Sequence, residues 1–125
     1  MKTVITAPHA PAAIGPYSHA VAAGDFLFTS GQIALDPTTG KLAGDTIEAQ
    51  AEQVLKNLEA VLEANGMTFA NVIKTTVFLT DLADFATVNG IYATRFSAEP
   101  PARSCVQVAG LPGGSKIEIE LVAHK

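Results

Sequence analysis

The chain has 125 residues, of which 48% are hydrophobic and 16% charged, and its net charge is −4 at pH 7. This length predicts one domain, residues 1–125, with a core that needs no disulfide or metal, and it leaves no room for a second domain. The eight Lys and Arg residues are dispersed along the sequence, so the basic runs typical of nucleic-acid binding are absent. The charged fraction lies below the about 25% typical of soluble domains, which indicates that other subunits cover part of the surface.

Targeting and membrane signals are also missing. The amino-terminal residues lack the apolar core of a signal peptide, and no apolar run approaches the ~20 residues of a membrane span. Cys105 is the only cysteine, so an internal disulfide is excluded. We therefore expect a soluble, cytoplasmic protein.

The first third of the chain predicts an irregular lead-in followed by a hairpin. Residues 8–16 contain three prolines and a glycine, which favour an ordered but irregular segment. Strands are predicted over Tyr17–Ala23 and Phe26–Ile33, joined by Gly24-Asp25. Ser30-Gly31 interrupts the second strand, and a glycine there marks a bulge, a close approach of another group to the backbone, or a simple kink.

An amphipathic helix follows, capped by Asp45 or Thr46 and ended by Gly66. Its apolar residues recur every three or four positions, which predicts one buried stripe: Ile47, Ala51, Val54, Leu55, Leu58, Val61 and Leu62. The opposite face is acidic and is interpreted as solvated surface.

Next come a strand over Val72–Leu79 and a second helix from about Asp84 to Phe96. One face of the strand is largely apolar and the other is mixed. The apolar face holds Ile73, Thr75, Val77 and Leu79, and the mixed face holds Val72, Lys74, Thr76 and Phe78. The helix is predicted to bury Phe85, Val88, Tyr92 and Phe96. Asn89 lies on the same helix face, where an asparagine requires hydrogen-bond partners, either in a neighbouring loop or in a functional site.

The stretch Pro100 to Val108 holds the most unusual chemistry. Its prolines keep the approach extended, and a strand is predicted over Cys105–Val108. Arg103 shares the sheet face of Cys105, and it is either a surface arginine or a fork that recognises a carboxylate or phosphate. Cys105 is either a small buried residue or, if His9 or His19 folds onto it, a nucleophile.

The last strand is predicted over Lys116–His124, after a turn at Leu111–Ser115. Its residues alternate, with Ile117, Ile119, Leu121 and Ala123 on one face and Lys116, Glu118 and Glu120 on the other. The two glutamates are either solvated or, if their face looks into a cleft, candidate bases.

These elements predict an α+β fold in which two helices cover one face of a mixed sheet. The other face, which includes Phe78 or Leu79 depending on register, is expected to pack against copies of the same chain. The sequence contains no phosphate loop, dinucleotide fingerprint or zinc spacing, and its three histidines are scattered, so we expect no metal.

Five stretches, in order over nearly the whole chain, resemble the Rid family of reactive-intermediate deaminases, also called the YjgF family, and within it the RidA subgroup. These stretches are Ala13-Ile14-Gly15-Pro16-Tyr17, Thr29-Ser30-Gly31-Gln32, Val72-Ile73-Lys74-Thr75-Thr76-Val77-Phe78, Pro101-Ala102-Arg103-Ser104-Cys105-Val106 and Lys116-Ile117-Glu118-Ile119-Glu120. The loop Ser97–Pro100 is shorter than this resemblance leads us to expect, which affects the rim of the site.

The resemblance implies a chorismate-mutase-like homotrimer that hydrolyses 2-imino or enamine acids to 2-keto acids and ammonia without a cofactor. Arg103 would clamp the substrate carboxylate, and Glu118, rather than Glu120, would activate water. The remaining matched positions line the cleft: Tyr17, Ser30, Gly31, Asn89 and Cys105.

Two other functions are compatible with the resemblance. One is a single-strand ribonuclease, against which the negative net charge argues. The other is a noncatalytic trimer that binds small carboxylates or shields apolar segments of other proteins. Both a deaminase and a carboxylate-binding trimer would need Arg103, so the sequence does not distinguish the enzyme from the binding protein.

Overall fold

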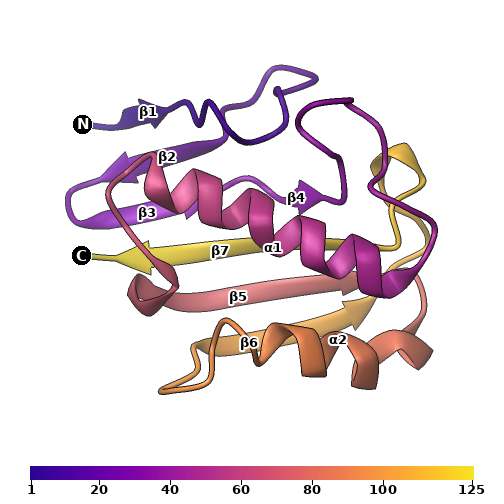
Figure 1. The fold of residues 1–125 in the computed structure, drawn as a ribbon. Coiled ribbons are helices and arrows are strands. Elements are labelled where there is room, and N and C mark those ends of the chain that lie inside the picture. The colour runs from indigo at the N-terminus through magenta and orange to yellow at the C-terminus, as the bar shows by residue number, and fades with distance from the viewer.

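The computed structural model describes residues 1–125. One mixed sheet carries two helices on the same face, which confirms the predicted α+β arrangement (Figure 1). The strand order is β1-β2-β3-β7-β5-β6, with β4 also paired to β7, and only the β5–β6 pair is parallel. The strands are β1 (Thr3–Ile5), β2 (Ala20–Ala23), β3 (Phe26–Thr29), β4 (Gln32–Ile33), β5 (Val72–Leu79), β6 (Ala102–Gln107) and β7 (Ile117–His124), and the helices are α1 (Ile47–Glu63) and α2 (Phe85–Tyr92).

Helix α1 forms as its periodicity predicts. The Thr46 hydroxyl caps it by accepting the Ala49 N–H at 3.2 Å, and Gly66 takes the left-handed conformation expected just beyond the end (φ 68°). The apolar stripe lies against the sheet within a core of 23 buried hydrophobic residues. Neither helix has the length and hydropathy that a membrane crossing requires.

The predicted hairpin is present, but its strands are shorter than expected. The first begins at Ala20 rather than Tyr17, and the second divides at Ser30-Gly31 into β3 and β4. At this break the pairing register against β7 shifts by one residue, from Phe28–Val122 to Gln32–Ile119, and the Leu121 N–H donates to the Thr29 hydroxyl (3.0 Å) instead of a backbone carbonyl. The sequence did not predict the three-residue strand β1.

Strand β5 has the predicted bounds, but its apolar face is interrupted at its start. A register shift against β7 between Val72 and Lys74 turns Ile73 outward, and Ile73 is 46% exposed while Val72 is buried. Beyond the shift, Thr75, Val77 and Leu79 are buried under the helices as expected. Phe78 therefore lies on the face that no helix covers.

The second half of the sheet differs from the prediction at two helix and strand ends. Helix α2 stops at Tyr92, although Phe96 is still buried, and Phe85 is 38% exposed rather than buried. Strand β6 begins at Ala102 instead of Cys105, because its parallel pairing with β5 starts at Lys74 and Ala102. Arg103 is therefore part of the edge strand.

The uncovered face of the sheet exposes large apolar side chains. Phe26, Phe28 and Val106 are 42%, 48% and 44% exposed. Phe28 pairs with Val122 and Phe78 with Glu118, so this face continues from β3 to β5 across β7. An apolar surface of this kind is typical of a protein interface.

Candidate functional site

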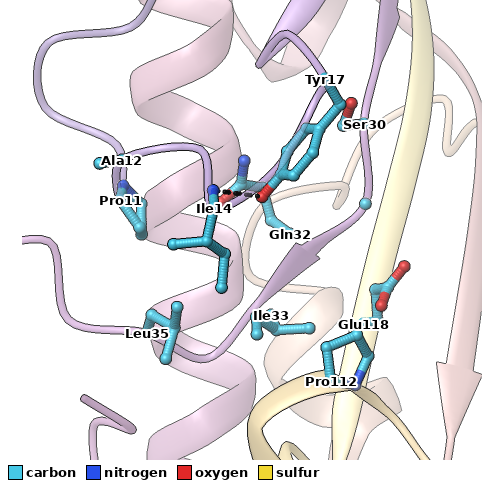
Figure 2. A pocket seen from close by; sticks show the side chains of 11 residues that line it. Pro11, Ala12, Ile14, Tyr17, Ser30, Gln32, Ile33, Leu35, Pro112 and Glu118 are labelled. Atoms are coloured by element: carbon cyan, nitrogen blue, oxygen red, sulfur yellow. Dashed lines mark hydrogen bonds between the residues drawn. The ribbon is translucent and has the colours of Figure 1, made fainter. Parts of the chain in front are cut away.

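A cavity of about 330 Å³ opens where β3 gives way to β4 (Figure 2). Its walls come from three parts of the chain: the irregular segment before β2, the segment from Ser30 through β4, and the start of β7 with the turn before it. The lining residues are Pro11, Ala12, Ile14, Tyr17, Ser30, Gly31, Gln32, Ile33, Leu35, Pro112 and Glu118.

Glu118 lies directly over Gly31. Its strand position pairs with Ile33, which brings its side chain beside the break in the neighbouring strand. A Cβ on Gly31 would lie 2.7 Å from Glu118 Cδ and 2.9 Å from Cγ, and it would collide with Oε2. The close approach predicted as one reason for this glycine is therefore confirmed, and the approaching group is a carboxylate.

The surroundings of Glu118 make its carboxyl group a weaker acid than an exposed glutamate. Burial raises the pKa of this carboxyl, and the nearby Glu120 raises it further. No cation offsets the two effects, because the one ion pair of the chain joins Arg95 to Glu52. Glu118 is thus a half-buried carboxyl suited to taking up and releasing a proton.

Tyr17 and Ser30 add hydroxyl groups to the same cavity. Tyr17 is 46% exposed, and its hydroxyl accepts only a long hydrogen bond from the Ile14 N–H (3.4 Å). The Ser30 hydroxyl donates its proton to Ser18 and keeps its lone pairs as acceptors. Both groups remain able to bind a polar ligand.

Arg103, Asn89 and Cys105 form a second cluster, between the edge strand β6 and helix α2. Arg103 Nη1 donates to Asn89 Oδ1 at 2.8 Å, which gives Asn89 the partner that its position requires. The guanidinium carbon lies 4.9 Å from the Tyr92 ring centroid and 5.4 Å from that of Phe85. No carboxylate of the chain pairs with Arg103.

The two arginines of the chain differ in this respect. Arg95 donates to both carboxylate oxygens of Glu52, at 2.9 and 2.8 Å. Arg103 is oriented only by neutral groups, an amide and two aromatic rings. Its remaining N–H groups can donate two parallel hydrogen bonds to an anionic ligand.

Cys105 is not placed as a nucleophile. Burial raises the pKa of its thiol, and the charge of Arg103 offsets only part of that effect. His19 hydrogen-bonds to Ala7 and Pro11 instead, and His9 is exposed in the amino-terminal segment. The nucleophile hypothesis is therefore wrong for this chain.

The two clusters lie on opposite faces of the sheet. Arg103 pairs with Thr75, which faces the helices, whereas Glu118 pairs with Phe78 on the uncovered face. Strand β5 separates their strands in the sheet order. One copy of the chain therefore brings Tyr17, Ser30, Gly31 and Glu118 together but does not add Arg103, Asn89 and Cys105 to them.

Sequence reasoning missed part of the cavity wall. Gln32 is only 5% exposed and lines the cavity, and Ile14, Ile33 and Leu35 give the wall its apolar character. Gln32 follows Gly31 directly, but nothing in its residue type signalled a role. No group of three or more His, Cys, Asp or Glu side chains is arranged to hold a metal ion.

Comparisons with known proteins agree over the whole chain. The sequence model of the family described as endoribonuclease L-PSP matches residues 7–125. The chain is 52% identical over 122 residues to reactive intermediate deaminase A, chloroplastic, of Arabidopsis thaliana, which covers 98% of this chain but 65% of that longer relative. It is 50% identical over 123 residues to 2-iminobutanoate/2-iminopropanoate deaminase of Mus musculus, covering 98% of this chain and 91% of that one. The solved structure of E. coli TdcF with bound serine matches with a TM-score of 0.94 at 46% identity over 98% of both chains.

Proposed function

This chain belongs to the endoribonuclease L-PSP family, and we propose that it hydrolyses reactive 2-imino and enamine acids to 2-keto acids and ammonia, as the names of its deaminase relatives suggest. Its ligand is a small carboxylic acid, and no nucleic acid or membrane takes part. The reaction takes place in the cytoplasm, with residues 1–125 acting as one domain.

The observation that carries this proposal is the unpaired Arg103. A guanidinium held by Asn89 and two aromatic rings keeps its charge and part of its hydrogen-bonding fork for a ligand. A substrate carboxylate fits that fork, and a bond of this kind contributes roughly 1.5–3 kcal/mol. Arg103 thereby orients the adjacent imine carbon.

Glu118 performs the proton transfers. Its carboxylate takes a proton from a water molecule while the water oxygen bonds to the imine carbon. The C=N electron pair moves to nitrogen, which receives that proton from Glu118, so a carbinolamine forms and the carboxylate is restored. Glu118 then carries the hydroxyl proton to the amine, the C–N bond breaks, ammonia leaves, and the hydroxyl oxygen becomes the carbonyl of the 2-keto acid. Water supplies the oxygen and two protons, so the overall reaction needs no oxidant or reductant. A pKa raised by burial suits Glu118 to both directions of transfer.

Two copies supply one site. Because Arg103 and Glu118 lie on opposite faces of one sheet, a substrate that touches both must lie between neighbouring subunits. The exposed Phe26, Phe28 and Val106 on the uncovered face provide the apolar contact for such an assembly. We assign a chorismate-mutase-like homotrimer, in which Arg103, Asn89 and Cys105 of one copy complete the cavity of the next.

A trapping assay tests the proposal. 2-Iminopropanoate is generated in situ, and semicarbazide competes with the protein for it. The wild type should suppress semicarbazone formation, and both Arg103→Ala and Arg103→Lys should lose most of that effect, because lysine keeps the charge without the fork. Arg95→Lys is the matched control, since it makes the same change at the arginine already paired with Glu52.

The result that would reject the arginine clamp is near-normal activity of Arg103→Lys. If the wild type binds 2-keto acids but leaves trapping unchanged, the chain is a carboxylate-binding module rather than an enzyme. Ribonuclease activity has no support in the cavity, whose only charged lining residue is Glu118.

A further inference from the structure

His19 is a buried histidine that the proposed reaction does not use. Its side chain is 6% exposed, and both ring nitrogens hydrogen-bond to the backbone of the amino-terminal segment that forms one wall of the cavity. We propose that neutral His19 is a positioning residue that fixes this wall, and that a second ring proton, which breaks the bond from Ala7, loosens the segment that leads into the wall and weakens substrate binding. This inference rests on the proposed deaminase function.

The hydrogen bonds define the protonation state of the ring. Nδ1 lies 2.9 Å from the Ala7 nitrogen, and that N–H is able only to donate, so Nδ1 carries no proton. Nε2 lies 2.7 Å from the Pro11 carbonyl oxygen, which is able only to accept, so Nε2 carries the proton. The ring is therefore the neutral Nε2–H tautomer with both nitrogens occupied.

The segment held by these bonds is part of the site. Pro11 and Ala12 line the cavity, and in Figure 2 they lie on the side away from Glu118. The His19 carbonyl also accepts the Ser30 N–H at 3.0 Å, next to Gly31. One residue thus joins the wall at Pro11 to the strand break beneath Glu118. It acts through the backbone and touches none of the reacting atoms.

Protonation is incompatible with this arrangement. A proton on Nδ1 would face the Ala7 N–H, and Ala7 is only 1% exposed, so its amide would lose its acceptor without gaining water. Among the residues that line the hollow beside His19, Tyr17 is the only other titratable one, and none is a carboxylate. The charged or titratable groups on the adjoining segments are Lys2, exposed His9, Asp36 beside Pro37 and, across the strand break, Glu118, while β3 carries none. The Asp36 carboxylate already accepts the N–H groups of Thr38 and Thr39. No group that faces the ring compensates for a second ring proton.

Two substitutions separate positioning from simple burial. Glutamine offers one acceptor and two donors and does not titrate, so His19→Gln should keep the wall in place and remove its sensitivity to acid. His19→Leu retains bulk but loses both bonds. His9→Gln is the matched control, because His9 is an exposed histidine of the same segment.

We expect the wild-type KM to rise severalfold on acidification, with a smaller change in kcat. His19→Leu should show the raised KM already at neutral pH. His19→Gln should show a KM near that of the wild type at neutral pH, without the rise in acid, and His9→Gln should behave as the wild type. Protection of the Ala7, His9, Ala10 and Ala12 amides against hydrogen exchange, measured by NMR and corrected for the intrinsic effect of pH, should fall in the same order in which KM rises.

The proposal is overturned if His19→Gln retains the acid rise in KM, or if His19→Leu matches the wild type in both KM and exchange. If the Leu variant does not fold, the Gln variant decides the question alone. If the wild type hydrolyses no imine, the proposed function fails, but the positioning role is still tested. Loss of amide protection at Ala7 in acid, abolished by His19→Gln, would support that role, and unchanged protection would overturn it.

Discussion

Replacing Gly31 by alanine tests the close approach of the carboxylate to the strand break. The new Cβ would collide with Oε2 of Glu118 and lie 2.7 and 2.9 Å from its Cδ and Cγ, so the side chain must move. Insertion of a methyl group into a packed core costs about 1–3 kcal/mol, and the cost here should lie at or below the low end because the contacted atoms belong to a flexible, half-buried side chain. The backbone of Gly31 does not need a positive φ, so the whole effect comes from this contact.

We expect Gly31→Ala to lose most of its deaminase activity, because a carboxyl group displaced from the cavity no longer serves the reacting water. The loss should approach the ~10²- to 10⁴-fold expected for removing a general base. The trapping assay measures activity, and thermal denaturation measures stability. Gly90→Ala is the control, since nothing lies within 4 Å of its added Cβ. Wild-type activity in Gly31→Ala would refute the assignment of Glu118 to the reaction.

Two further predictions concern pH and stability. Because burial raises the folded-state pKa of Glu118, the stability associated with its protonated form is fully present below its unfolded pKa and is lost as the pH rises through the folded pKa. Glu118→Gln should therefore melt above the wild type near neutral pH, and the gap should close below about pH 4; equal melting temperatures throughout would contradict the burial argument. The pH dependence of stability has the opposite sign at Glu52, because the hydrogen bond from Arg95 lowers the pKa of this carboxyl. The stability that ionised Glu52 contributes is present above its unfolded pKa and is lost as the pH falls through its folded pKa. Glu52→Gln should lower the free energy of unfolding by roughly 0.5 kcal/mol near neutral pH, and this difference should shrink in acid. Denaturant titration at neutral and acidic pH measures it, and a difference that stays constant would contradict the prediction.

The elements with a long, regular pattern were predictable from sequence. Helix α1 has seventeen residues, an unambiguous cap and a continuous apolar stripe, so local signals and burial agree. The alternation in β7 likewise placed Glu118 on the face opposite the core. Strand β1, with three residues at the sheet edge, contains too few alternations to be recognised.

Features that depend on pairing between strands were not predictable. The register shift that turns Ile73 outward arises from how β5 meets β7, and no property of the residue itself announces it. The early start of β6 has the same origin, because its parallel partner extends the strand back to Ala102. The Arg103–Asn89 bond also needs the spatial relation of β6 to α2, although each residue was noted separately.

The candidate site shows the same division. Motif resemblance selected Glu118, Gly31 and Arg103, and the strand alternation supported the first. Neither signal revealed that Arg103 and Glu118 of one chain lie on opposite faces of the sheet. The face on which each side chain lies depends on the register of β5, β6 and β7 together. Nor did it identify Gln32 or the role of His19, whose partners are backbone groups eight and twelve residues away.

The central claim is that neighbouring copies share each site, and mixing two inactive variants tests it most directly. Arg103→Ala keeps Glu118, and Glu118→Gln keeps Arg103, so each homotrimer alone should be inactive. In trimers reassembled from equal amounts of both, about a quarter of the sites should combine an intact Glu118 from one copy with an intact Arg103 from the next. The account predicts that activity returns to about that fraction of the wild-type value. If reassembled mixtures, shown by mass to contain both variants, stay inactive, Arg103 and Glu118 do not act across a subunit boundary and the account is wrong.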